Sequence, residues 1–172
     1  MPRGSGEDKR ALALKTITDR QELIEKTGNY APLLIFAEGG TTNNSAILKF
    51  KKGAFVSEKR VKPLLLNYKV HTIHPVFDVI ELLPLAILQL SWACMQVNII
   101  EMPDFEPNEY LFETHKDKGK DRWEIYAWAL REAMMKVGNM EPCDIPMKEK
   151  ICYEEYMQMN PKYKTPWYTE KL

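Results

Sequence analysis

Strand-length apolar runs alternate with helix-length segments along most of this sequence. The spacing of apolar residues predicts helices over residues 7–27, 78–92, 121–137 and 147–159, and a shorter helix over 51–59. Continuous or alternating apolar residues predict strands over residues 33–36, 61–70 and 95–102. This alternation is typical of an α/β domain, so we expect a mixed sheet flanked by helices.

The segment 121–137 has the clearest helical pattern. Its expected apolar stripe consists of Trp123, Tyr126, Ala127, Leu130, Ala133, Met134 and Val137. Gly138 is expected to cap this helix and Gly28 to cap the first one, because glycine adopts the left-handed conformation beyond a helix without strain. Two of the best-defined helices therefore have a predicted end as well as a predicted face.

The longest uncharged run covers residues 82–100, and its 19 residues are close to the length that spans a bilayer. However, it contains Pro84, Gln89, Ser91, Gln96 and Asn98. Its second half has the alternation of a strand. A buried or interfacial helix followed by a strand therefore fits better than a spanning helix.

Length, charge and cysteine content limit the classes of function that this chain can have. The chain has 172 residues, enough for one domain with a real core, and 24 basic residues balance 24 acidic ones. A zero net charge gives no argument for a nucleic-acid partner. The three cysteines are far apart and form no Cys/His cluster, so we expect no metal site and reduced thiols. Residues 1–10 are polar and do not form a secretory signal.

The expected strand 33–36 runs into a polar cluster, Glu38-Gly39-Gly40-Thr41-Thr42-Asn43-Asn44. A strand that feeds a glycine-rich loop can aim backbone N–H groups at an anionic ligand. Composition alone favours an ordinary surface turn here, since glycine, threonine and asparagine are common turn residues. This cluster alone does not distinguish an anion-binding loop from an ordinary surface turn.

The wider sequence resembles one family in several consecutive blocks. The stretch Phe36-Ala37-Glu38-Gly39-Gly40-Thr41-Thr42-Asn43-Asn44 is similar to the Phe-Pro-Glu-Gly-Thr block of glycerolipid acyltransferases, in the form of the lysophosphatidylcholine acyltransferase branch. Phe50-Lys51-Lys52-Gly53-Ala54-Phe55 resembles the segment after that block in the same branch, and Val61-Lys62-Pro63-Leu64 resembles the fourth block. Further matches lie at residues 88–92, 102–103 and 107–109, and Pro2-Arg3-Gly4-Ser5 resembles the end of the second block.

The resemblance implies a partial acyltransferase domain over residues 1–160, followed by a flexible tail over 161–172. It implies transfer of a fatty acyl group from acyl-CoA, as co-substrate without a further cofactor, to a lysophospholipid. It also implies a place on the cytosolic face of the endoplasmic reticulum or another endomembrane. The acceptor and its phosphate would be held by Arg3, Glu38, Gly39, Gly40, Thr41, Thr42 and Asn43. Lys51 and Lys52 are expected either on a solvated face or near phosphate or anionic lipid.

The first block of the family, a His and an Asp with four residues between them, has no counterpart here. The residues five positions after His71, His74 and His115 are Val76, Val79 and Lys120. Acyl transfer to a hydroxyl needs a base for the hydroxyl proton, so we expect this chain alone to be inactive. The chain is then either part of an acyltransferase or a catalytically inactive lipid-binding or interaction fragment. Missing upstream elements would also leave apolar surface exposed, so we expect poor solubility.

Overall fold

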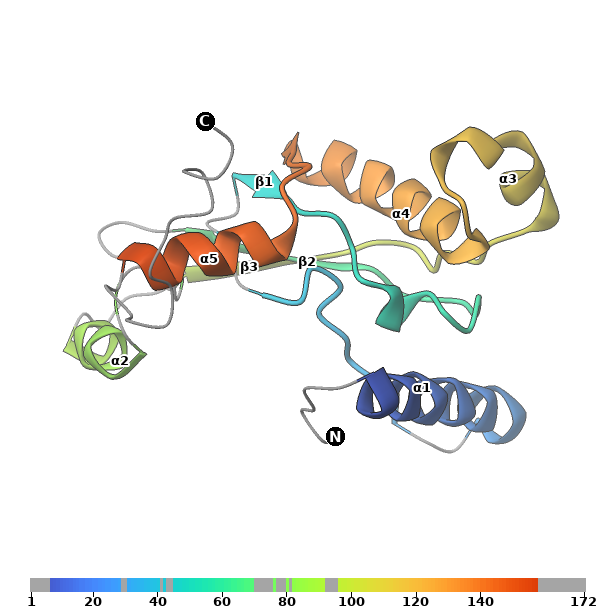
Figure 1. Ribbon diagram of the computed structural model, residues 1–172, viewed down its shortest axis with the longest axis horizontal. Helices are drawn as coiled ribbons and strands as arrows, with labels where there is room; N and C mark the ends of the chain where they lie inside the picture. The colour runs from blue at the N-terminus through green and yellow to red at the C-terminus, as the bar shows by residue number, and fades with distance from the viewer. Residues whose placement is uncertain are drawn as a thin grey trace. The chain divides into compact units, whose positions relative to one another are not determined.

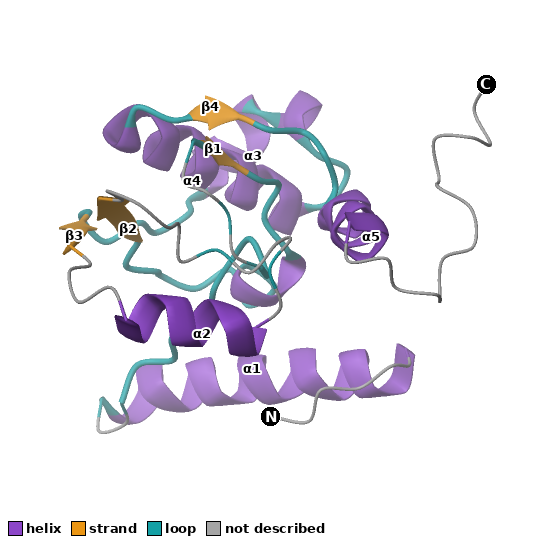
Figure 2. Ribbon diagram, turned by 90° about the vertical axis from the view of Figure 1, so that its left-hand side faces the viewer, coloured by secondary structure: helices purple, strands orange, loops and turns teal. Residues whose placement is uncertain are grey.

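A computed structural model of the chain describes residues 7–28, 31–40, 42, 45–69, 76, 80, 82–91 and 96–157 (Figure 1). The described residues form helices together with both parallel and antiparallel strand pairs, which confirms the α/β class (Figure 2). The chain divides into two compact units, each built from three separate segments. The first unit comprises Met1–Ala37, Phe50–Pro63 and Pro103–Glu132, and the second comprises Glu38–Lys49, Leu64–Met102 and Ala133–Leu172.

The first unit is mainly helical. It contains α1 (Glu7–Thr27), a 3₁₀ turn (Lys52–Ala54), α3 (Glu109–Thr114), a second 3₁₀ turn (Lys116–Lys118) and the start of α4 (Arg122–Gly138). The predicted cap of α1 is confirmed, because Gly28 has φ +64° and its N–H donates to the Ile24 carbonyl at 2.8 Å. The predicted short helix over 51–59 is reduced to the single 3₁₀ turn.

Aromatic rings form the core of the first unit. Phe55 and Tyr126 are fully buried and meet edge to face, with their ring centroids 5.1 Å apart. Phe105 stacks on Tyr126 at 5.6 Å. The Tyr126 hydroxyl lies 2.8 Å from the Lys59 carbonyl oxygen and 3.2 Å from that of Phe105. Burial, and to a lesser extent the charge of Glu106, raises the pKa of Tyr126, so the hydroxyl keeps its proton as a donor.

The helix α4 confirms the prediction for 121–137, with two corrections. Of the expected stripe, Tyr126, Ala127 and Leu130 are buried but Val137 is exposed, while Ile125 and Met135 are buried instead. Gly138 is the last helical residue, and the left-handed residue that follows the helix is Asn139, with φ +49°. Asparagine tolerates this conformation better than most non-glycine residues.

The second unit holds two separate two-stranded sheets (Figure 2). Strand β2 (Leu64–Lys69) pairs antiparallel with β3 (Gln96–Glu101), in a register that places Leu65 opposite Ile100. Strand β1 (Ala46–Ile47) pairs parallel with β4 (Glu141–Pro142), almost a hundred residues later. The helices α2 (Leu82–Ser91) and α5 (Met147–Met157) complete the unit.

Strands β2 and β3 and helices α2 and α5 confirm the central part of each of four predicted elements. Residues 70, 78–79, 81, 92, 95 and 158–159 of the predicted ranges lie outside the described part. The predicted strand 33–36 is wrong, because these residues are irregular and pair with no described strand. Pro84 lies in the first turn of α2, where its missing N–H costs no helical hydrogen bond. None of the described helices is long and apolar enough to cross a membrane.

Candidate functional site

The Glu38 side chain closes a loop in the second unit. The chain turns at Ala37 and Glu38, and the Leu48 backbone N–H, ten residues later, donates to Glu38 Oε2 at 3.1 Å. Between them β1 is held by β4, with the Cys143 N–H donating to the Ile47 carbonyl at 3.1 Å. A backbone N–H therefore helps to fix the half-buried carboxylate at the base of the loop.

The two glycines after Glu38 meet separate backbone requirements. Gly39 has φ +75°, a conformation that other residues adopt only with strain. At Gly40 a Cβ atom would lie 2.5 Å from Met147 Cε and 2.9 Å from Met147 Sδ, so the loop lies close against the start of α5. The positive φ favours glycine at position 39, whereas the contact at Gly40 is with the flexible end of the Met147 side chain, which can move.

The structure brings together Glu38, Gly39 and Gly40 from the predicted acceptor-binding set, and Thr42 is half-buried nearby in the sequence. The other members of that set, Arg3, Thr41 and Asn43, lie outside the described residues. The prediction for this loop as a binding site therefore stays a prediction, supported by a defined turn around one anchored carboxylate.

The predicted phosphate or membrane contacts, Lys51 and Lys52, lie in the first unit and are exposed. The Lys51 N–H donates to the Ala37 carbonyl at 2.8 Å, which ties the two segments of the unit together. Lys52 Nζ lies 5.7 Å from the ring centroid of Trp123, a cation–π distance. The Glu38 loop belongs to the second unit, whereas Lys51 and Lys52 belong to the first.

Sequence reasoning missed an ion-pair cluster around Arg122, the first residue of α4. Its guanidinium donates two bonds to Glu109, at 2.9 and 2.8 Å, and one to Glu58 at 2.8 Å. It also lies 3.9 Å from the Phe112 ring centroid. The hydrogen bonds that Arg122 donates to Glu109 lower the pKa of Glu109. The same bonds to Glu109, and then the bond to Glu58, raise the pKa of Arg122. The partners are 13 and 64 residues away, which no local pattern reveals.

An open concavity of about 490 Å³ lies beside this cluster. Its lining comes from α3, from the chain that links α3 to α4, and from the start of α4. The lining residues are Glu109, Phe112, Glu113, Lys116, Gly119, Lys120, Arg122 and Ile125. We call it the α3–α4 concavity. The only sequence signal for it is the run of alternating lysines at 116, 118 and 120 around Gly119.

The described residues contain no group of three or more His, Cys, Asp or Glu side chains placed to hold a metal ion. His115 is half-buried with its ring centroid 5.0 Å from that of Trp128. His71, His74 and Cys94 lie outside the described part, and Cys143 and Cys152 form no disulfide. His115 is therefore a packing residue in this structure.

Comparison with known proteins finds similarity to lipid acyltransferases. The chain is 24% identical over 145 residues to "Lysophospholipid acyltransferase LPEAT1" of Arabidopsis thaliana, covering 84% of the chain and 34% of that protein. It is 33% identical over 141 residues to "Lysophosphatidylcholine acyltransferase" of Drosophila melanogaster, covering 79% of the chain and 24% of the relative. It is 31% identical over 97 residues to the human "Lysophosphatidylcholine acyltransferase 1", covering 55% of the chain and 18% of the relative.

The chain thus spans between about a fifth and a third of the length of these relatives. No model of a known protein family and no solved structure matches it.

Proposed function

Because the chain is homologous to lysophospholipid and lysophosphatidylcholine acyltransferases over most of its length, we propose that it is the acceptor-binding part of such an enzyme. The reaction transfers a fatty acyl group from acyl-CoA to the free hydroxyl of a lysophospholipid. The thioester C–S bond breaks, an ester C–O bond forms, the hydroxyl loses a proton and the CoA thiol leaves. The chain contributes the site that orients the acceptor.

The observation that supports this assignment most directly is the fixed carboxylate of Glu38 beside two glycines. A carboxylate has two oxygens and about four acceptor positions, and a glycerol hydroxyl is a suitable donor to it. The turn at Gly39 and Gly40 exposes backbone close to that carboxylate, where N–H groups can face a phosphate. These are the two polar parts that a lysophospholipid presents near its free hydroxyl.

The base that would take the hydroxyl proton is not identified in this sequence, since no histidine precedes an aspartate at the required spacing. The 172-residue chain alone is therefore expected to bind acceptor without transferring acyl groups. The second hypothesis, a catalytically inactive lipid-binding fragment, makes the same prediction for the isolated chain. An in-frame His and Asp with four residues between them in the transcript upstream of the Met1 codon would favour the enzyme.

A membrane surface is the second proposed partner, and α2 is its most suitable contact. Three large apolar side chains at spacings of four and three residues share one face of this uncharged helix. Leu83, Ile87 and Leu90 are exposed by 72%, 59% and 84%, while Leu85 on the other side is buried. A helix of this length lies in the interface rather than across it. The exposed apolar face of α2 supports a membrane contact. We propose an endomembrane, in particular the endoplasmic reticulum, as the location of that contact.

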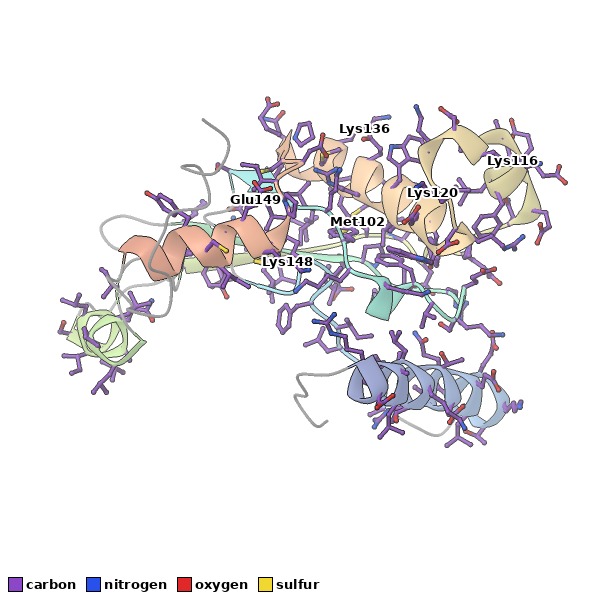
Figure 3. All side chains as sticks on the ribbon, in the orientation of Figure 1. Met102, Lys116, Lys120, Lys136, Lys148 and Glu149 are labelled. Carbon is purple, nitrogen blue, oxygen red and sulfur yellow. The ribbon has the colours of Figure 1, made fainter. Side chains whose placement is uncertain are left out.

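Substitutions at Glu38 test the acceptor site. Glu38→Gln keeps an oxygen for the Leu48 N–H but loses the charge, so folding should be retained while affinity for lysophosphatidylcholine falls roughly tenfold. Glu38→Ala loses both the loop anchor and the site. Calorimetric titration with a short-chain lysophosphatidylcholine below its micelle concentration measures the affinity. Glu149→Gln, on α5 of the same unit, is the matched control for loss of one negative charge (Figure 3).

Unchanged affinity in Glu38→Gln and Glu38→Ala would exclude Glu38 from acceptor binding. Transfer of acyl groups by the isolated chain, measured with labelled acyl-CoA, would instead show that it carries its own base.

A further inference from the structure

Most residues that line the α3–α4 concavity are charged. Phe112 and Ile125 in its lining are buried, whereas Lys116 and Lys120, both labelled in Figure 3, are exposed. Both lysines belong to the first unit, together with every other lining residue. The concavity therefore lies within one compact unit.

The cations around this concavity differ in how they are compensated. Arg122 is paired with Glu109 and Glu58, and Lys118 Nζ lies 3.0 Å from Asp117 Oδ2. Among the described residues, Lys116 and Lys120 form no ion pair with any carboxylate. Two lysines that line the same hollow thus keep their positive charge available to a ligand.

Gly119 fixes the segment that carries both lysines. A Cβ atom at this position would lie 2.5 Å from Glu124 Cβ and 3.0 Å from the Ile125 backbone nitrogen. Backbone cannot yield as a flexible side chain can, so this close approach requires glycine. The segment between Lys116 and Lys120 is thereby held against the first turn of α4.

The helix terminus itself is not the site. Glu124 Oε2 accepts from the Lys120 N–H at 2.7 Å and from the Asp121 N–H at 3.5 Å, so a carboxylate of the chain already occupies the start of α4. Any anion in the concavity must be bound by the lysine side chains instead. Lysine ammonium groups are common ligands of phosphate, which they bind as point charges.

We propose that the α3–α4 concavity binds a phosphate-bearing group through Lys116 and Lys120. The proposal rests on the proposed function only for the choice of phosphate source. One source is the adenosine 3′,5′-bisphosphate part of CoA. The other sources are a phospholipid headgroup and free phosphate.

Direct binding to the full chain tests the proposal. Adenosine 3′,5′-bisphosphate, glycerophosphocholine and inorganic phosphate are titrated separately, and both dissociation constants and backbone amide shifts are recorded. We expect one probe to shift the amides of residues 116–122. The Lys116→Gln/Lys120→Gln variant should weaken its binding about tenfold or more. Lys116→Arg/Lys120→Arg, which keeps both charges, should retain most of the affinity. Lys148→Gln on α5 is the control for loss of a lysine elsewhere (Figure 3).

The probe that binds with this dependence identifies the source of the phosphate. Binding of no probe would overturn the proposal, and so would binding that the Lys116→Gln/Lys120→Gln variant leaves unchanged while its thermal midpoint equals that of the wild type. Phosphate binding in a chain that does not bind lysophosphatidylcholine would leave this site standing and reject the proposed function. Binding of lysophosphatidylcholine by a chain that binds no phosphate probe would reject this site and leave the proposed function standing.

Discussion

At the scale of single residues, the hydroxyl of the fully buried Tyr126 side chain joins two backbone segments of the first unit. Tyr126→Phe removes a donor from two carbonyl groups, those of Lys59 and Phe105, and leaves the ring packing in place. We expect the free energy of unfolding to fall by about 1–2 kcal/mol, measured by urea denaturation. Tyr110→Phe on α3 is the control, because this side chain is 73% exposed. Equal effects of the two substitutions would contradict the assigned role.

The ion pair between Glu109 and Arg122 should make stability depend on pH. Because the Arg122 hydrogen bonds lower the pKa of Glu109 in the folded chain, the native state binds this proton less readily than the unfolded state. The stabilisation is present above the unfolded pKa of about 4.3 and is lost as the pH falls through the lower, folded value. Glu109→Gln should therefore lower the thermal midpoint at neutral pH, with a difference that shrinks on acidification.

Glu113→Gln, one turn along α3, controls for loss of a carboxylate that has no arginine partner among the described residues. If the difference in thermal midpoint between Glu109→Gln and the wild type does not change with pH, the ion pair between Glu109 and Arg122 is screened by solvent and contributes little to stability.

Which residues could be predicted depends on how far away their partners lie. Gly28 was predicted as a cap because its requirement is set by the helix that precedes it. The resemblance predicts Glu38 and Gly39 as acceptor-binding residues, and this role stays a prediction. The structure shows a local role for each: a hydrogen bond from the Leu48 N–H and a positive φ. Arg122 could not be predicted, since Glu58 and Glu109 are brought to it only by the fold.

At the scale of elements, α2 carries an apolar face that water solvates poorly. Full burial of one such side chain contributes about 1.5–3 kcal/mol, so two of them control a large part of any transfer to lipid. We expect the Ile87→Lys/Leu90→Lys variant to bind phosphatidylcholine vesicles at least about tenfold more weakly in flotation assays. Tyr110→Lys, an exposed aromatic residue on α3, is the control. Vesicle binding that is the same in all three proteins would exclude α2 as the lipid contact.

The elements predicted correctly are those whose pattern is local. The helices α1 and α4 have helical spacing and a clear end, and the strands β2 and β3 are each long enough to show apolar alternation or a continuous run. The expected strand 33–36 has the right composition, but a strand also requires a partner, and no described strand pairs with it. The pairing of β1 with β4 was missed because two residues give no pattern and the partner is far away in the sequence.

At the scale of the whole molecule, each compact unit is assembled from three stretches of sequence, and α4 contributes to both. A cut that removes residues after Glu132 would take away the last six of the 17 residues of α4, as well as β4 and α5. Neither unit can therefore be isolated as a continuous fragment. Functional tests of either site should use the full chain.

The exposed apolar surface of the second unit leads to a prediction about the behaviour of the whole chain in solution. In the β2–β3 pair, Leu66 opposes Ile99 and Tyr68 opposes Val97 on one face, and Tyr68, Val97 and Ile99 are exposed. Among the described residues, each of these strands also has one unpaired edge. The apolar face of α2 adds to this surface.

Apolar patches and open strand edges of this kind promote association. We therefore expect aggregation in detergent-free buffer and recovery of a monomer in a mild nonionic detergent, measured by size-exclusion chromatography with light scattering. The Ile87→Lys/Leu90→Lys variant should raise the soluble fraction without detergent, because it removes part of that surface, whereas Tyr110→Lys should not. A wild-type chain that is monomeric and unfolds cooperatively without detergent would show that these faces are covered in solution, and it would also remove the main support for a membrane contact through α2.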